Sequence, residues 1–162
     1  MEEKNKTTII IGDDNLGWCK LMQAYLQDFS ELQILGVTSD GEEQVEMIKT
    51  LKPGIVITDL KRDKGISGYE VLNKCHELQL NETKFIVETA AYYPETITKL
   101  NKLGVKHILF KPFTFDDLIK EIEEIQREVD NSLTIVDNDI YQIKNSFIDF
   151  IRQKLINFKI IK

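Results

Sequence analysis

Short apolar runs recur at regular intervals along the first 130 residues of the chain, and this feature most constrains its fold. The runs cover residues 8–11, 34–37, 55–58, 85–87 and 107–110, and they are mostly β-branched or aromatic. Short continuous runs of this kind are typical of strands buried on both faces. Between them, apolar residues return every three or four positions, which predicts amphipathic helices. Five such units predict an α/β fold, with a doubly wound parallel sheet and helices on both of its faces.

Local signals mark where the predicted helices begin and end. Asp40 precedes the second helix, and Thr114 stands where a capping residue would start the fifth helix. Gly104 follows the fourth helix, at the position where a terminal glycine is common. These signals agree with the division drawn from the apolar runs.

Composition narrows the class of protein. The chain has 162 residues, of which 42% are hydrophobic and 30% charged, so we expect one globular domain with an appendage. It has no apolar run long enough for a membrane span and no apolar signal core at its start, so we expect a soluble, cytoplasmic protein with no membrane partner. The net charge of -6 argues against nucleic acid as a partner. Cys19 and Cys75 lack companions at metal spacing and are expected to be reduced, buried thiols.

Polar residues stand at the ends of four predicted strands. Asp13 and Asp14 end the first strand, Asp59 the third, Thr89 the fourth and Lys111 the fifth. The carboxyl ends of parallel strands share one edge, where sites form in such sheets. One aspartate after a strand is usually a turn or capping residue, but four such stations are hard to explain that way. Three clustered carboxylates repel one another unless a cation lies among them, and Mg²⁺ prefers oxygen ligands, so we predict a Mg²⁺ site.

The sequence resembles the receiver domain of two-component response regulators over about residues 7–129, as in chemotaxis receivers and, more loosely, sporulation regulators. The residues that carry the resemblance are Asp13-Asp14, Asp59, Thr89-Ala90 and Lys111-Pro112-Phe113. The resemblance implies a flavodoxin-like sheet with strand order 2-1-3-4-5. We therefore expect a receiver domain over residues 1–130, and the pattern of the tail adds a helical C-terminal extension over residues 131–162.

The resemblance also implies roles for these residues. Asp59 would accept a phosphoryl group from a histidine kinase or a phosphotransfer protein, and Thr89 and Lys111 would bind the phosphoryl oxygens. The protein would thus be a phosphorylation-controlled switch, not a conventional enzyme, catalysing at most its own phosphorylation and dephosphorylation.

The resemblance implies a metal-ligand set as well. Asp13, Asp14 and Asp59 would hold Mg²⁺ together with the backbone carbonyl of Lys61. Asp14 would bind the ion directly and Asp13 mainly through water.

Two departures from the family pattern bear on this reading. The loop after Asp59 lacks the usual Met-Pro, and Gly68 comes one residue later than usual. Its charge run, residues 61–64, either alters kinase docking or phosphoryl lifetime or is a plain solvated loop. Ile108 stands where receivers normally carry an aromatic switch residue, so the usual rotamer switch is in question, and Tyr92 or Tyr93 is a candidate replacement.

The tail follows a different pattern. Periodicity lapses after Glu128, and Asp139 is a candidate cap for a separate helix. A single apolar face is then formed by Ile140, Ile143, Phe147, Phe150, Ile151, Leu155 and Phe158. Such a face must be buried against the receiver, a second copy or an effector. We expect a homodimer, through this helix or through the surface of the fourth helix, fifth strand and fifth helix, in a chain that is either receiver-only or part of a longer regulator.

Other functions remain open from the residues alone. A degenerate receiver would act as an interaction module without phosphorylation. A Mg²⁺-dependent phosphatase would want a second aspartate where Lys61 stands, and a flavodoxin-like FMN carrier would want a phosphate-binding loop where Asp13 and Asp14 stand.

Overall fold

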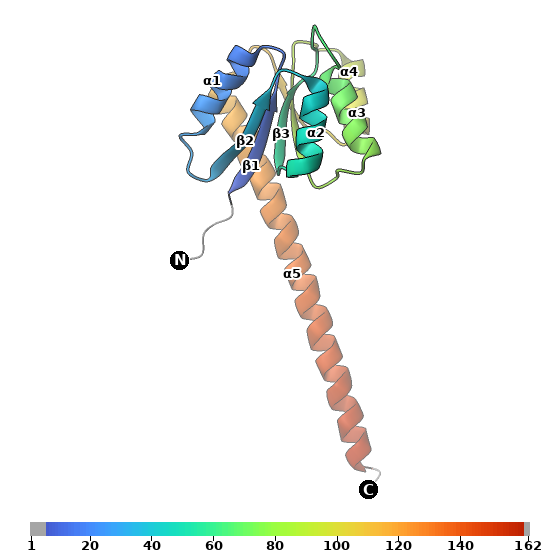
Figure 1. Ribbon diagram of the computed structural model, residues 1–162. Coiled ribbons are helices and arrows are strands. Elements are labelled where there is room, and N and C mark those ends of the chain that lie inside the picture. The colour runs from blue at the N-terminus through green and yellow to red at the C-terminus, as the bar shows by residue number, and fades with distance from the viewer. Residues whose placement is uncertain (1–5, 161–162) are drawn as a thin grey trace. The chain divides into compact units, whose positions relative to one another are not determined.

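The computed structural model describes residues 6–160, without the side chains of residues 145 and 147–160. Strands and helices alternate as β1 (Thr7–Gly12), α1 (Leu16–Leu26), β2 (Leu32–Thr38), α2 (Gly41–Leu51), β3 (Ile55–Asp59), α3 (Gly68–Glu77), β4 (Lys84–Thr89), α4 (Pro94–Lys102), β5 (His107–Phe110) and α5 (Phe115–Ile160) (Figure 1). The strands form one parallel sheet in the order β2-β1-β3-β4-β5. The predicted fold class and strand order are confirmed.

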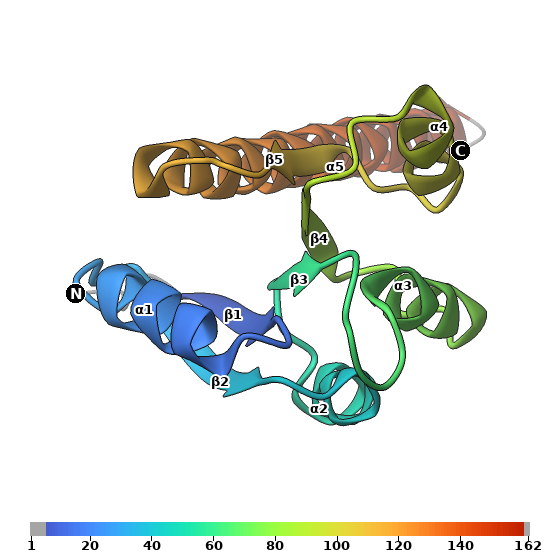
Figure 2. The same ribbon diagram turned by 90° about the horizontal axis from the view of Figure 1, so that it is seen from above.

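Helices cover both faces of the sheet, which explains why its strands are apolar without alternation. Seen from above, α1 lies on one side of the sheet, and α2 and α3 lie on the other (Figure 2). Ile9, Ile10 and Ile11 are consecutive and all fully buried, so their side chains enter both layers of the core. Burying each such side chain contributes roughly 1.5–3 kcal/mol before entropy is counted.

The helix signals read from the sequence have physical counterparts. The Asp40 side chain accepts a hydrogen bond from the Glu43 N–H and caps α2. Thr114 and Asp117 bond each other's backbone N–H groups at the start of α5, which is a capping box. Gly104 has a φ of 78°, a left-handed conformation that favours glycine at a helix end.

The predicted break in the tail is wrong. Instead of lapsing after Glu128 and restarting at Asp139, α5 continues without interruption from Phe115 to Ile160. The segment between them contains neither proline nor glycine, so nothing in it terminates a helix. The hydroxyls of Ser132 and Thr134 bond carbonyls one turn earlier and leave the helix intact.

The chain divides into two compact units, Met1–Glu123 and Glu124–Lys162. In the second unit, Ile140 and Ile143 of the predicted apolar face are exposed. The other members of that face, at positions 147, 150, 151, 155 and 158, lie outside the described side chains. Among the described residues, no helix has both the length and the apolar character needed to cross a membrane.

Candidate functional site

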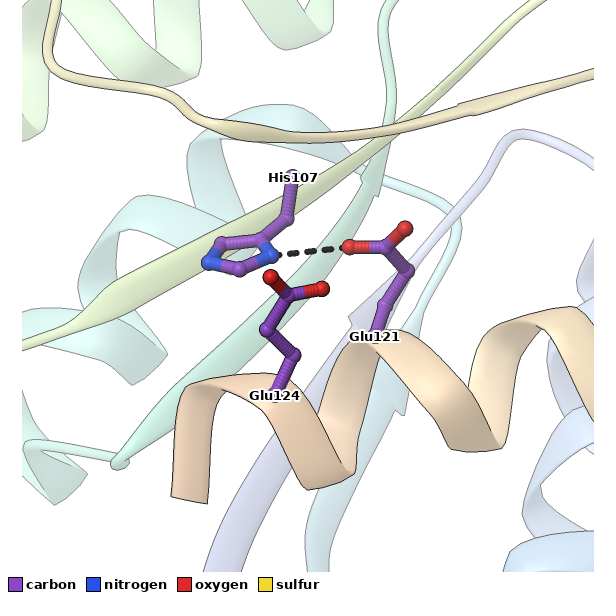
Figure 3. Close-up of side chains that lie close together, drawn as sticks. All are labelled: His107, Glu121 and Glu124. Atoms are coloured by element: carbon purple, nitrogen blue, oxygen red, sulfur yellow. Dashed lines mark hydrogen bonds and ion pairs between the residues drawn. The ribbon is translucent and has the colours of Figure 1, made fainter. Parts of the chain in front are cut away.

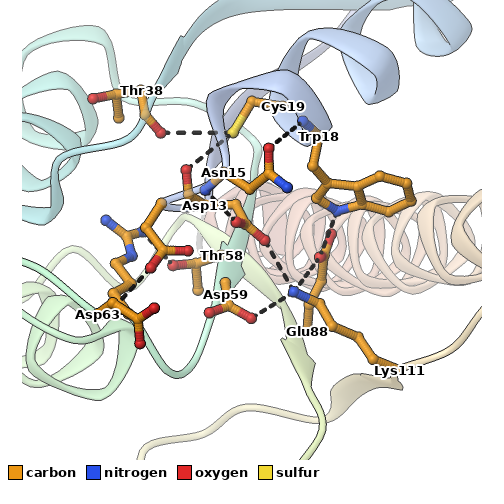
Figure 4. A network of polar contacts seen from close by, with 12 residues as sticks. Asp13, Asn15, Trp18, Cys19, Thr38, Thr58, Asp59, Asp63, Glu88 and Lys111 are labelled. Atoms are coloured by element: carbon orange, nitrogen blue, oxygen red, sulfur yellow. Dashed lines mark hydrogen bonds and ion pairs between the residues drawn. The ribbon is translucent and has the colours of Figure 1, made fainter.

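Three strands bring charged residues together at one edge of the sheet. Asp13 directly follows β1, Asp59 ends β3, and Lys111 directly follows β5. The ammonium nitrogen of Lys111 lies 2.9 Å from Asp13 Oδ2 and 2.7 Å from Asp59 Oδ1, so it bridges the two carboxylates (Figure 4). Residues nearly 100 positions apart in the chain thus form one charged centre.

Asp14 and Asp13 also bind nearby backbone. Asp14 Oδ2 accepts a hydrogen bond from the Asp63 N–H at 2.7 Å, and Asp13 Oδ1 accepts one from the Asn15 N–H at 2.8 Å. Asn15 in turn caps α1 by accepting from the Trp18 N–H. These bonds fix the loop after β1, so that both aspartates are held by backbone geometry.

A fourth carboxylate, Glu88, joins this centre, and the sequence reasoning missed it. Glu88 pairs with Asp59 in the β3–β4 ladder, and its side chain is fully buried. Its Oε2 accepts a hydrogen bond from Trp18 Nε1 at 3.0 Å and lies 3.5 Å from Lys111 Nζ. A glutamate inside a run of buried strand residues was the available signal, because buried acids require partners. We call Asp13, Asp14, Asp59 and Glu88 the carboxylate cluster.

Burial and mutual repulsion perturb these groups. Burial raises the pKa of Asp59, Lys111 opposes this rise, and the neighbouring aspartates add to it. Burial also raises the pKa of Glu88, from an ordinary 4.5 to about 7, against the opposing effects of its bonds to Trp18 and Lys111. Burial lowers the pKa of Lys111, but the hydrogen bonds to Asp59 and Asp13 outweigh it and hold the pKa above its ordinary value. Lys111 is therefore a permanent cation at this site.

Arg62 supplies a second cation, which the sequence reasoning took as part of a charge run at the surface. Its side chain is buried, and its Nη2 donates to Gln44 Oε1 and, at 3.1 Å, to Thr58 Oγ1. Burial lowers the pKa of Arg62, while Asp59 and Asp13 raise it. The loop after Asp59 is therefore anchored to the fold through Arg62, while the other three residues of the charge run, Lys61, Asp63 and Lys64, are exposed.

The far end of this loop, at Gly68, lies against the backbone beside Asp59. Gly68 donates its N–H to the Leu60 carbonyl at 3.0 Å, which closes the loop. A Cβ on Gly68 would lie 2.0 Å from the Asp59 backbone oxygen, so only glycine fits there. Gly65, within the same loop, has a positive φ of 69°, a conformation that favours glycine.

The residues predicted to take part in switching lie on β4, on β5 and in the segment between β4 and α4. Thr89 ends β4, is buried, and accepts a hydrogen bond through Oγ1 from the Ala91 N–H. Ile108 packs partly buried against the core beside α4. Tyr92 is 72% exposed, and its ring lies 4.3 Å from that of Phe110. Tyr92 thus contacts β5, whereas Tyr93 is an exposed residue that precedes α4.

Trp18 connects the carboxylate cluster to the aromatic residues after β5. Its ring stacks on Phe115 at 5.5 Å and meets Phe113 edge-on at 5.8 Å. Since its indole nitrogen bonds Glu88, a change of charge in the cluster acts directly on the environment of this indole.

The pair formed by His107 and Glu121 lies away from the carboxylate cluster, at the start of β5. His107 begins β5, at the opposite end of that strand from Lys111, and its Nδ1 lies 2.8 Å from Glu121 Oε2 (Figure 3). This pair ties β5 to α5 and takes no part in the carboxylate cluster.

The donor set fits a magnesium ion. The three aspartates already outnumber the two cations, Lys111 and Arg62, so the cluster carries excess negative charge even where Glu88 is protonated. The oxygens not used in the bonds described above include Asp14 Oδ1 and Asp59 Oδ2. Hard oxygen donors with uncompensated charge are what Mg²⁺ binds. Lys61 is exposed in the loop after Asp59, and its carbonyl stays a predicted ligand.

This fold and strand-end site define the class of doubly wound α/β domains that carry a cluster of charged residues at the carboxyl edge of a parallel sheet. The family model described as "Response regulator receiver domain" matches residues 9–123. The chain therefore belongs to the response regulator receiver domain family.

Solved structures agree with this assignment at the level of fold. A DNA-binding response regulator of the LuxR family from Staphylococcus aureus matches with 24% identity and a TM-score of 0.67, over 74% of this chain and 98% of that one. The receiver domain of a putative Luxo repressor protein from Vibrio parahaemolyticus matches with 24% identity and a TM-score of 0.69, over 80% and 97%. RcsB from Salmonella enterica serovar Typhimurium, bound to promoter rprA, matches with 21% identity and a TM-score of 0.64, over 74% and 67%.

Proposed function

We propose that this receiver is an active phosphorylation switch in the cytoplasm, in which Asp59 accepts a phosphoryl group from a histidine kinase or a phosphotransfer protein. The observation that carries the proposal is the bridging of Asp13 and Asp59 by Lys111. A degenerate receiver would have no need to keep a half-buried ammonium between two buried carboxylates.

The chain's own residues account for the transfer. An Asp59 oxygen attacks phosphorus in line, the P–N bond of phosphohistidine breaks, and the electron pair leaves with the imidazole nitrogen. Lys111 then pairs with a phosphoryl oxygen, and the Thr89 hydroxyl donates to another. Mg²⁺ held by Asp13, Asp14, Asp59 and the carbonyl of Lys61 would supply charge neutralisation.

The switch follows from charge. A phosphoryl group adds roughly -1.5 to -2 charges, if the acyl phosphate resembles a phosphorylated hydroxyl. Lys111 must then divide its contacts among Asp13, Glu88 and the phosphoryl oxygens, where it now bonds Asp59. Movement of Lys111 and Thr89 pulls on the ends of β5 and β4, and we propose that the output is a changed protein-binding surface on α4, β5 and the start of α5. RcsB binds promoter DNA in its structure, whereas for this chain we propose a protein partner.

Incubation with Mg²⁺ and acetyl phosphate, followed by intact mass measurement, tests the proposal. We expect one added phosphoryl group that is lost in Asp59→Asn. Since rapid hydrolysis can hide the adduct, the beryllofluoride complex is measured in parallel. Absence of both the adduct and beryllofluoride binding would show a degenerate module, and continuous turnover of the phosphodonor without an adduct would indicate a phosphatase.

A further inference from the structure

The part of α5 beyond Glu124 carries a row of exposed apolar side chains. They are Val129, Leu133, Val136, Ile140 and Ile143, which are 41%, 59%, 52%, 57% and 69% exposed. Their spacing alternates between four and three residues, which is a seven-residue repeat. This repeat is typical of coiled coils, because it averages 3.5 residues per turn and keeps one seam facing a partner helix. We call these five residues the heptad row.

We propose that copies of this chain associate through the heptad row in a parallel, in-register coiled coil. The proposal goes beyond the phosphorylation switch and does not depend on it.

The repeat assigns each member of the row to a core position. Leu133 and Ile140 occupy a positions, and Val129, Val136 and Ile143 occupy d positions, since the step from a to d is three residues. All five are aliphatic, and no polar residue interrupts the row. Most helical stability comes from burying an apolar face. An exposed apolar row of this length is therefore expected to be buried, and the same row on a second helix is a matching surface.

A second copy in parallel register matches this seam over its whole length. In the sequence, the repeat continues at Phe147 and Phe150. The a position before Val129 holds the polar residue Gln126, and the a position after Phe150 holds the polar residue Lys154. In parallel register every apolar residue meets its own counterpart. An antiparallel alignment that meshes a with d positions places Val129 opposite Lys154 or Phe150 opposite Gln126, which buries an unmatched polar group.

The charged residues at the g and e positions, which flank the heptad row, agree with a parallel, in-register arrangement. Asp139 occupies a g position and Lys144 the following e position, and both are exposed. In a parallel coiled coil these positions face each other across the interface, so Asp139 meets Lys144 of the second copy with opposite charge. The branched residues at d favour three or four strands over two.

Sedimentation equilibrium of the full chain, without a phosphodonor and over a range of concentrations, tests the proposal. We expect an oligomeric mass that is unchanged in Asp59→Asn, so its outcome is separate from that of the phosphorylation test. A monomer at all concentrations would overturn the proposal and indicate that the row packs on the receiver or awaits another protein.

Neighbouring residues provide matched controls. Val136→Asp and Ile140→Asp place a charge in the seam, and we expect at least a tenfold weaker association. Ile135→Asp and Tyr141→Asp change equally exposed apolar residues one position away, at 62% exposure each, and should leave the mass unchanged. Equal effects of both sets, or none in either, would overturn the proposal.

Orientation is tested with one introduced cysteine, because the native Cys19 and Cys75 are buried. In Leu133→Cys, parallel register brings the new thiol opposite its own copy, so oxidation should give a covalent dimer. An oligomer that oxidation does not cross-link would overturn the parallel arrangement.

Discussion

Replacing the buried Glu88 by glutamine should make the protein more stable at neutral and alkaline pH, by an amount that depends on pH. Glu88 is fully buried, and its pKa is raised from 4.5 to about 7. Each pKa unit corresponds to about 1.4 kcal/mol, so ionised Glu88 costs the folded state about 3 kcal/mol relative to its protonated form. Glutamine keeps the size of the side chain and an oxygen acceptor for Trp18 but cannot ionise.

The direction in which the free energy of unfolding changes with pH follows from the protons that Glu88 binds in the folded and unfolded states. Between about pH 4.5 and 7 the folded state holds a proton on Glu88 that the unfolded chain releases, so the wild-type protein loses stability as pH rises through this window. The variant lacks this loss. The difference in unfolding free energy, variant minus wild type, should therefore rise by about 3 kcal/mol across the window.

Urea denaturation followed by far-ultraviolet circular dichroism, without divalent cations and from about pH 5 to about pH 8, measures this difference. Trp18 fluorescence is avoided as the probe because the indole bonds Glu88 itself. Glu82→Gln removes an exposed carboxylate before β4 and controls for the loss of net charge. A difference that stays constant with pH in Glu88→Gln would refute the reasoning, since Glu88 would then keep the same protonation in both states.

Other experiments probe the loop after Asp59 and the predicted metal site. Arg62→Ala removes the hydrogen bonds that the buried guanidinium donates to Gln44 and Thr58, which keep the bond between them, so chemical denaturation should show a loss of roughly 1–3 kcal/mol, against little change in the exposed neighbour Lys61→Ala. Gly68→Ala forces a Cβ to within 2.0 Å of a backbone oxygen and should cost roughly 2 kcal/mol or more in the same assay, whereas Gly54→Ala has its nearest atom at 3.6 Å and should cost less. Addition of Mg²⁺ should change Trp18 fluorescence in a saturable way; an unchanged spectrum would contradict a metal beside the carboxylate cluster.

Strand positions and topology could be predicted because burial on both faces leaves a direct mark in the sequence. The run over residues 55–58 predicted β3, and the structure adds only the adjacent Asp59. The expectation that Asp13, Asp59 and Lys111 meet rested on one rule, that parallel strands end at a common edge. The ion pairs of Lys111 with both aspartates satisfy that rule.

Other features of the site could not be predicted, because they depend on contacts between elements. A charged residue in a loop has the same local pattern whether it points outward or inward, and only packing against Gln44 and Thr58 turned Arg62 into a buried cation. Glu88 differs from its strand neighbours in type alone, and its partners come from α1 and from the segment after β5. The tail was misjudged for the converse reason, because polar residues lower the apolar periodicity without ending a helix.

The sequence by itself determined the alternation of strands and helices, the sheet edge at which the charged side chains meet, and the seven-residue repeat of the tail. It could do so because periodicity and residue type are local properties. Only the tertiary structure decided which charges are buried and what balances them. Ionisation and pairing depend on the solvent excluded and on the neighbours brought within a few ångströms, and these are fixed only when distant segments pack together.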